Sequence, residues 1–191
     1  MSTATTTIAI TQPNAHLIDV SISVLAHHEQ VIFRMPVWTP GSYLVREYAR
    51  HVRDVIAMSD GQTAGWHKID KRSWQVATTP GSTVVVSYRV YAYDLTVRTN
   101  HVDDTHAFFN PAAVVMQVDG VTGPLPVVVD APAAWEVATQ LDCLSTTTSA
   151  TRRHWSYVAA DYDALYDAPF EIGTHRSARF YVDDIPHDIV V

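Results

Sequence analysis

The stretch "HVDDTH" at residues 101–106 holds the residue types best suited to binding a metal ion. His101, Asp103, Asp104 and His106 offer nitrogen and oxygen donors that suit a divalent cation. Loops rich in Asp and His are usually solvated and bind no ion, however. The sequence therefore favours a loop without a metal, predicts no metal ligands in this chain, and leaves an ion site here as the alternative.

The remaining reactive residues do not complete an active site. A zincin motif needs two histidines four residues apart on a helix, and His28-Glu29 lacks the second histidine and lies between predicted strands, where a polar hairpin turn is expected. Cys143, in "LDCLSTTTSA", has no basic neighbours to activate its thiol, so we expect a small buried or half-buried residue. No P-loop, dinucleotide-binding or G-x-S-x-G motif occurs. The sequence predicts no catalytic residue in this chain.

Composition limits the function classes further. The chain has 191 residues, 47% of them apolar, which is enough for one sizeable core. The formal net charge of −7 argues against nucleic-acid binding, and a single cysteine excludes an intramolecular disulfide. No apolar run approaches the ~20 residues that span a bilayer, and "MSTATTTIAI" lacks the features of a signal peptide. We expect a cytoplasmic protein without a membrane partner, although a trimmed leader would leave no trace.

Strand patterns dominate the chain. In "HLIDVSISV", Ile18, Val20, Ile22 and Val24 alternate with polar residues, as in a half-buried strand. Turn residues separate such segments about ten residues apart, which predicts an all-β fold, an antiparallel β-sandwich. Pro80-Gly81 indicates a hairpin between its two flanking strands. The other predicted strands are "VIFRMPV", "SWQVATT", "STVVVSYRVYAY", "AAVVMQVDG", "LPVVVD", "WEVATQL" and "HWSYVAA".

Helical patterns are rare, and one or two short helices are expected. In "YLVREYARHV", apolar residues fall on one side at helical spacing, which predicts a short helix starting near Tyr43. The apolar side consists of Leu44, Val45, Tyr48 and Val52. "DYDALYD" predicts one further turn of helix with Asp161 as its N-cap.

The segment "MPVWTPGSYLVREYARHV" at residues 35–52 combines a turn, aromatic residues and a charged run. Pro40-Gly41 is ordinary turn chemistry. The aromatic flanks and the charges behind them need a further explanation. This segment resembles the signature of the glycyl aminopeptidase family of zinc metallopeptidases, peptidase family sixty-one. Similar stretches follow in the same order and cover most of the chain: "YRVYAYDLTVRTNHVDD", "FFNPAAVVMQV", "WEVATQL" and "DYDALYDAPFEIG", where Ala168 stands in place of an expected Ser.

The resemblance implies a larger enzyme in three parts. In that family an N-terminal β-sandwich precedes a thermolysin-like zinc domain, and a PDZ domain often follows. Residues 1–173 would be the sandwich, and residues 174–191 the linker and first strand of a truncated catalytic domain, in two extended pieces around Pro186. The zinc is then expected in the missing domain, and this chain alone should not hydrolyse peptides. Its partners would be its own catalytic domain and, in the full-length protein, a peptide substrate.

The resemblance also suggests roles for particular residues. The 35–52 segment would hold one shape against the neighbouring domain through Trp38, Pro40, Gly41, Tyr43, Arg46, Glu47 and Arg50. The alternative is that the aromatics belong to the core and the charges to a solvated helix face. Glu171 is a candidate for binding the substrate α-ammonium group, because a carboxylate is its natural partner. Arg98 and Tyr93 are weaker candidates for the cleft wall, and a buried salt bridge of Arg98 within the sandwich is favoured over that role.

A second function class fits the same composition. A free-standing β-sandwich module, for example one that binds carbohydrate, could use exposed tryptophans as stacking platforms, and the chain has five. An exposed planar row of aromatics would favour this alternative. An apolar patch near Glu171 and the C-terminal residues would favour the domain of a larger peptidase.

Overall fold

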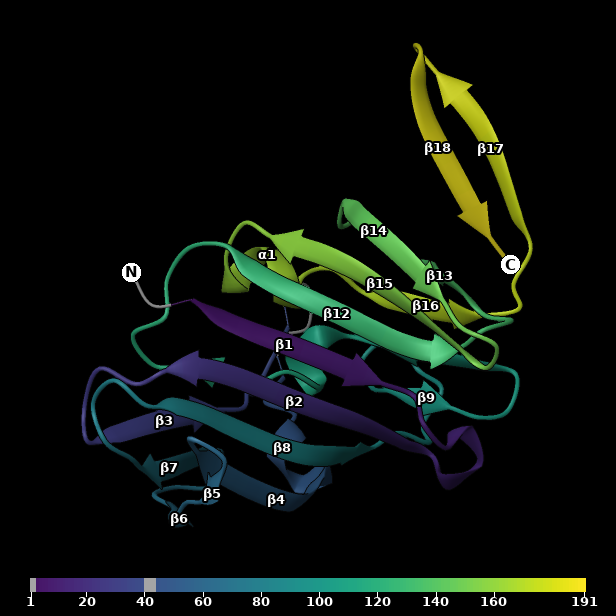
Figure 1. The fold of residues 1–191 in the computed structure, drawn as a ribbon. Helices are drawn as coiled ribbons and strands as arrows, with labels where there is room; N and C mark the ends of the chain where they lie inside the picture. Colours follow the sequence, from purple (N-terminus) through teal and green to yellow (C-terminus); the bar gives the residue numbers. More distant parts are fainter. Residues whose placement is uncertain (1–2, 40–43) are drawn as a thin grey trace.

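An eight-stranded sheet forms one layer of the molecule in the computed structural model, which describes residues 3–39 and 44–191 (Figure 1). Its pairings are antiparallel except that of β1 with β12, which is parallel. In spatial order its strands are β14 (Cys143–Thr148), β15 (Arg152–Ala159), β12 (Leu125–Pro132), β1 (Ala4–Ala9), β2 (Leu17–Leu25), β8 (Thr83–Tyr91), β4 (Val52–Ser59) and β5 (Gln62–Thr63).

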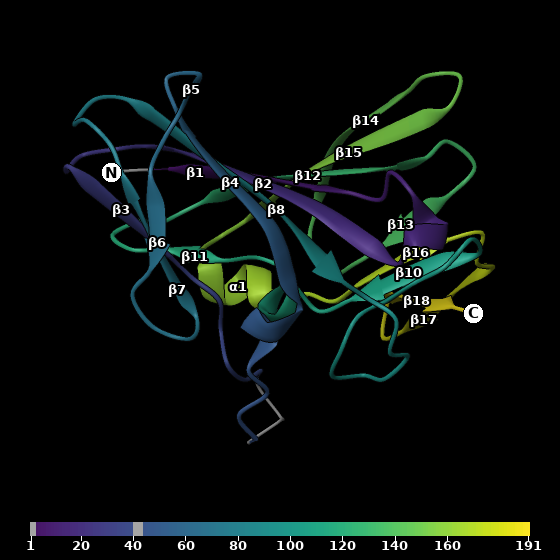
Figure 2. The same ribbon diagram turned by 90° about the horizontal axis from the view of Figure 1, so that it is seen from below.

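Two four-stranded sheets form the opposite layer, with the short helix α1 (Tyr162–Tyr166) between them (Figure 2). One contains β11 (Gln117–Val118), β3 (Gln30–Arg34), β7 (Ser73–Ala77) and β6 (Trp66–Lys68). The other contains β13 (Glu136–Ala138), β16 (Phe170–Gly173), β10 (His106–Phe109) and β9 (His101–Val102). This arrangement confirms the predicted all-β sandwich.

The core lies between the layers and follows the period of two. Ile18, Val20, Ile22 and Val24 of β2 are all buried, as the sequence predicts, because alternate side chains of a strand point to one face. The facing layer contributes Phe33, Phe109 and Phe170 among its fully buried side chains. Helix α1 closes the gap between the two smaller sheets by burying Leu165, and the Asp161 carboxylate accepts a hydrogen bond from the Ala164 N–H, which confirms the predicted N-cap.

Two strand predictions need correction. Pro80-Gly81 does not close a hairpin, because β7 pairs with β3 and β6 whereas β8 pairs with β2 and β4. Both edges of each strand are already occupied, so the turn carries the chain from one layer to the other. "AAVVMQVDG" is mostly not a strand: it runs from the 3₁₀ helix η3 (Pro111–Ala113) through an irregular buried segment to β11. The buried Tyr88 hydroxyl replaces a strand partner there, donating to Val114 O at 2.8 Å and accepting from Met116 N–H at 3.0 Å.

The helix predicted after the Pro40-Gly41 turn is shorter than expected. Pro40, Gly41 and Tyr43 lie outside the described residues. A 3₁₀ helix, η2 (Tyr48–His51), begins five residues later than predicted, because Glu47 adopts a left-handed φ of 49° that interrupts helical backbone. Leu44 and Val45 are exposed, so the expected apolar helix face does not form.

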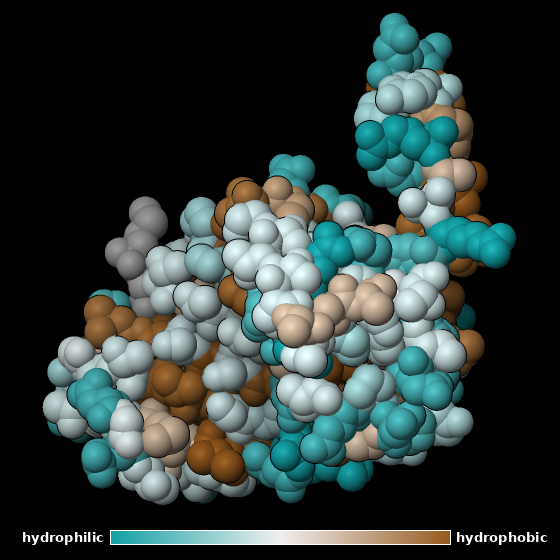
Figure 3. Space-filling model, turned by 45° about the vertical axis from the view of Figure 1, so that its right-hand side comes forward, coloured by the Kyte–Doolittle hydropathy of each residue, from teal (hydrophilic) through white to brown (hydrophobic). Residues whose placement is uncertain are grey.

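The last strands form a hairpin that projects from the sandwich (Figures 1 and 3). β17 (Ser177–Val182) pairs with β18 (Ile185–Val190), and no residue of the hairpin is buried. The turn is at Asp183-Asp184, both with positive φ as in a type I′ turn, and not at Pro186, which lies inside β18 opposite Tyr181. The two extended pieces are therefore as predicted, but their dividing point is not.

A further 3₁₀ helix, η1 (Pro13–Ala15), connects β1 to β2. Among the described residues, no helix is long and apolar enough to cross a membrane.

Candidate functional site

The β13-β16-β10-β9 sheet brings several of the candidate residues onto one face. Glu171 on β16 lies opposite Phe108 on β10, and Phe108 lies opposite His101 on β9. His101 forms an isolated bridge with Tyr93. Because directly opposed residues point to the same side of a sheet, these four side chains share one face. Residues of the other parity, such as Ile172, are buried in the core.

Aromatic and imidazole rings stack along this face. The ring centroids of His16 and Tyr93 lie 3.8 Å apart, those of Tyr93 and His101 5.4 Å, and those of His101 and His106 5.0 Å. His16 is fixed by a 2.6 Å hydrogen bond between its Nδ1 and the Val102 carbonyl. The stack connects the start of β2 to the β9–β10 turn, and sequence reasoning did not single out His16, because only the pairing of distant strands places it there.

Three side chains from "HVDDTH" converge at the β9–β10 turn. His101 Nε2 lies 3.0 Å from Asp103 Oδ2, and His106 Nδ1 lies 3.5 Å from Asp103 Oδ1. One potential ligand atom from each residue lies within 4.8 Å of the others. Asp104 is exposed and does not belong to this group. The sequence analysis left an ion site in "HVDDTH" as the alternative. The structure brings three of its four candidate residues together.

The Asp103 carboxylate is held in its ionised form. Burial alone would raise its pKa, but hydrogen bonds from Thr105 and His101 and from the backbone N–H groups of Thr105 and His106 outweigh burial and hold that pKa well below its usual range. Three of these bonds, from Thr105 Oγ1 at 2.6 Å, Thr105 N at 2.8 Å and His106 N at 3.0 Å, end on Oδ1. Oδ2 is bonded to His101 alone among the described residues.

Glu171 is half-buried next to this group. Burial raises the pKa of its carboxyl, and the electrostatic influence of His106 and His101 opposes that rise. The carboxylate is therefore on the same side of the sheet as two imidazoles, with part of its surface still open to solvent. Such a group can receive a cation.

The two candidates for the cleft wall, Tyr93 and Arg98, lie in different surroundings. Tyr93 is 54% exposed and belongs to the ring stack. Arg98 is exposed in the loop after β8, where its backbone N–H donates to Thr96 Oγ1 at 3.2 Å. The alternative of a buried Arg98 salt bridge is therefore wrong, because residues 93–98 are all exposed and do not enclose the guanidinium group. Leu95 and Val97 of the same loop are exposed.

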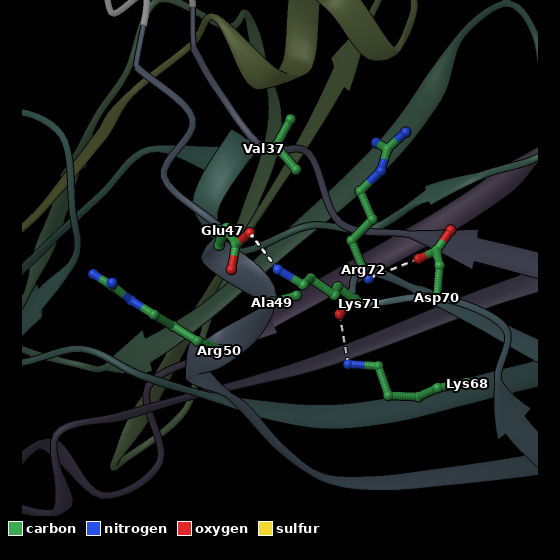
Figure 4. A pocket seen from close by; sticks show the side chains of 8 residues that line it. All are labelled: Val37, Glu47, Ala49, Arg50, Lys68, Asp70, Lys71 and Arg72. Carbon is green, nitrogen blue, oxygen red and sulfur yellow. Dashed lines mark hydrogen bonds and ion pairs between the residues drawn. The ribbon is translucent and has the colours of Figure 1, made fainter.

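The 35–52 segment lines a separate surface pocket of about 490 Å³ (Figure 4). Lys71 Nζ pairs with Glu47 Oε1 at 3.2 Å, and Lys68 Nζ donates to the Lys71 carbonyl at 2.6 Å. Arg50 comes from the same segment and, in Figure 4, points away from these contacts. The lining residues are Val37, Glu47, Ala49, Arg50, Lys68, Asp70, Lys71 and Arg72. The charged run therefore pairs partly within the chain, through an exposed ion pair of small energetic value.

Trp38 is 45% exposed, so it does not belong to the core. Leu44 and Val45 are exposed with it, and the Arg46 N–H donates to the Val37 carbonyl at 2.6 Å. The buried aromatic of the segment is Tyr48. Apolar side chains thus remain at the surface on both sides of residues 40–43.

Cys143 corrects one further expectation. It is exposed, not buried, because every residue of the edge strand β14 is exposed. Its Sγ lies 3.6 Å from the Ser145 carbonyl. His28 and Glu29 lie in an exposed turn between β2 and β3, as expected, but those strands belong to different sheets, so this turn closes no hairpin either.

Comparisons with known proteins show the family of this chain and its fold. The model of the peptidase M61 N-terminal domain matches residues 5–174. A solved structure of an aminopeptidase N family protein from Idiomarina loihiensis is 32% identical, with a TM-score of 0.90 over 98% of this chain and 32% of that one. An M1 zinc metallopeptidase from Deinococcus radiodurans is 13% identical, with a TM-score of 0.58 over 97% of this chain and 45% of that one, which shows a shared fold. No curated protein sequence matches. The chain therefore spans about a third of the first relative and less than half of the second.

Proposed function

Since this chain belongs to the family of peptidase M61 N-terminal domains, we propose that it is the non-catalytic domain of a zinc-dependent, glycyl aminopeptidase-like enzyme. It docks on the catalytic domain and shapes the substrate cleft. The chain contains no His-Glu-x-x-His motif, so the zinc ligands and the hydrolytic step belong to residues outside it. The same resemblance suggests a PDZ domain in the complete protein. The Idiomarina relative supports this proposal, because the chain corresponds to 32% of its length.

The observation that carries the cleft-shaping role is the position of Glu171. It is a half-buried carboxylate on a sheet face, and the charged groups that act on it are the imidazoles of His106 and His101. An aminopeptidase must bind a protonated α-amine, and a carboxylate of this kind supplies the counter-charge. Tyr93 lies further along the same face and offers an exposed phenol ring as a wall.

The C-terminal hairpin supports the docking role. Because paired residues share a face, Ala178, Phe180 and Val182 lie on the same side as Ile185 and Ile189, whereas the Arg179–Asp188 ion pair lies on the other side. Phe180, Val182, Ile185 and Ile189 are all exposed, and the hairpin projects away from the body of the sandwich (Figure 3). We propose that residues 174–191 start the catalytic domain, and that the rest of that domain covers this side of the hairpin.

The surface around residues 38–45 supports a second contact with a neighbouring domain. Trp38, Leu44 and Val45 are exposed apolar side chains that add nothing to the core. In the proposed enzyme they contact the catalytic domain, with Arg46, Glu47 and Arg50 at the edge of that contact. We place Pro40, Gly41 and Tyr43 in the same contact on the sequence resemblance alone.

Carbohydrate binding is less favoured. Trp74, Trp135 and Trp155 are buried in the core, which leaves Trp38 and Trp66 exposed on separate elements. The ring stack at the β9–β10 turn contains a single Tyr among imidazoles and is no flat apolar platform.

The proposal is tested by comparing the 191-residue chain with the complete protein encoded by its gene. The complete protein should contain a His-Glu-x-x-His motif after Val191 and should cleave aminoacyl-p-nitroanilides in a chelator-sensitive manner. The chain alone should be inactive. A gene product without that motif, or turnover by the chain alone, would contradict the proposal.

A further inference from the structure

We propose that His101, Asp103 and His106 form a binding site for one zinc-like divalent cation within this chain. The inference concerns the β9–β10 turn itself and is independent of the proposed peptidase role. From the sequence alone we favoured a solvated loop without a metal at "HVDDTH". The structure changes that interpretation, because it brings three donor side chains together, which their order in the sequence does not show.

The distances match the coordination geometry of zinc. With bonds of about 2.0–2.1 Å, the ligand atoms of a tetrahedral site lie about 3.3 Å from one another. His101 Nε2 and Asp103 Oδ2 lie 3.0 Å apart, and the three potential ligand atoms, one from each residue, all lie within 4.8 Å of one another. Little movement is needed for the three side chains to close around an ion.

The carboxylate has one oxygen available for a cation. Three hydrogen bonds from Thr105 and His106 hold Asp103 Oδ1 and fix the plane of the group. In the part of the chain that the structure describes, Oδ2 has a single bond, to His101 Nε2. Outer contacts of this kind orient a ligand and strengthen metal binding. A cation needs a bare ring nitrogen, so on binding the neutral His101 ring carries its proton on Nδ1 and Nε2 is free for the metal.

The two imidazoles are also held in place before any ion binds. His101 is buried and lies between Tyr93 and His106, with ring centroids at 5.4 and 5.0 Å. His106 Nδ1 lies 2.9 Å from Thr105 Oγ1, a contact that holds the ring before an ion binds and that the cation would replace. The side chains of His106 and Asp103 remain 28% and 29% exposed, so an ion can reach the site from solvent.

The donor set favours particular cations. Two imidazoles and one carboxylate suit Zn²⁺, Co²⁺ or Ni²⁺, whereas Ca²⁺ and Mg²⁺ require a shell of oxygen ligands. The carboxylates of Asp103 and Glu171 would balance the charge of the ion, because Glu171 lies on the same face as both histidines. Bound there, the cation would link the start of β9 to the start of β10 and fix the turn between them.

The test is titration of the chelator-treated 191-residue chain with ZnCl₂ by calorimetry. We expect one equivalent to bind, and the melting temperature to rise by about 5–10 °C at a hundredfold excess over Kd. Co²⁺ should give a visible spectrum of low-coordinate cobalt without thiolate bands. CaCl₂ and MgCl₂ should not compete. Absence of saturable zinc binding up to about 100 µM would overturn the proposal.

Matched variants locate the ion. His106→Ala and Asp103→Asn should each weaken zinc binding by more than about 100-fold, since loss of even an outer partner costs about 10–100-fold. Asp104→Asn removes the neighbouring exposed carboxylate and His67→Ala an exposed imidazole on β6, and both should bind as the unmodified chain does. Circular dichroism confirms that each variant is folded. Equal affinity in all four variants, or equal loss in the two controls, would show that zinc binds elsewhere and would overturn the proposal.

Discussion

Glu171 and His101 lie on the same face of one sheet, separated only by the β10 strand. The two residues are 70 positions apart in the sequence, and strand pairing through Phe108 brings them together. A half-buried carboxylate and a stack of imidazoles therefore share a surface whose reverse side is core. This relationship gives the chain a polar site on an otherwise structural sandwich.

Replacing Glu171 tests its proposed contact with the substrate amine. In the complete enzyme, Glu171→Gln keeps the shape and removes the charge, and loss of one partner of a buried charged pair costs roughly 2–5 kcal/mol. The kcat/KM for free-amine substrates should fall by at least about 30-fold. N-blocked peptides should be cleaved no worse than before, and Glu29→Gln in the exposed β2–β3 turn should have no effect. Equal losses on both substrate types would make Glu171 a structural residue.

Alkaline pH should destabilise the fold through the buried Tyr88 and the partly buried Tyr162. Burial raises the pKa of Tyr88 and of Tyr162 above the unfolded value of about 10. The folded state then keeps protons that the unfolded state loses. The contribution of these groups to the free energy of unfolding is therefore fully present below about pH 10. Above that pH the free energy of unfolding falls by about 1.4 kcal/mol per pH unit for each such group. Urea unfolding between pH 7 and 11 measures this slope.

Tyr88→Phe separates the two effects of that hydroxyl. At pH 7 it should cost about 1–3 kcal/mol, because Val114 O and Met116 N lose their buried partner. Above pH 10 its slope should be shallower than that of the unmodified chain, since one titrating group is gone. An unchanged slope would mean that Tyr88 does not stay protonated in the folded state.

The sandwich should fold without its C-terminal hairpin. Residues 177–191 contribute no buried side chain, so a chain ending at residue 176 should keep its melting temperature within about 2 °C. Phe170→Ala, in contrast, removes a fully buried ring stacked on Phe109 at 5.1 Å and should cost about 3–5 kcal/mol. Differential scanning calorimetry compares the two. A large loss on truncation would place the domain boundary elsewhere.

Sequence reasoning succeeded where local pattern and burial agree. The alternation in β2 and the Asp161 cap depend on near neighbours, and both are confirmed. The prediction of a hairpin at Pro80-Gly81 was wrong, because the residues of a turn do not determine which other strands pair with the two strands that flank it. The prediction that Cys143 is buried or half-buried was wrong for a similar reason. Its sequence does not show that it lies on an edge strand, where every residue is exposed. The site itself depends on pairings between β9, β10 and β16, which no local pattern specifies.

The two faces of the C-terminal hairpin provide the last test. Phe180 and Tyr181 are neighbours of similar size, 44% and 65% exposed, but they point to opposite sides of the hairpin. In the proposed enzyme the Phe180 side is covered by the catalytic domain and the side with the Arg179–Asp188 pair stays in water. Burying a Phe side chain is worth about 1.5–3 kcal/mol, so Phe180→Ser should destabilise the complete protein by about that amount. Tyr181→Ser should change its stability by less than about 0.5 kcal/mol. In the isolated chain both substitutions should leave the melting temperature unchanged, because neither side is covered there. If Phe180→Ser were as mild as Tyr181→Ser in the complete protein, the hairpin would not be part of the domain contact.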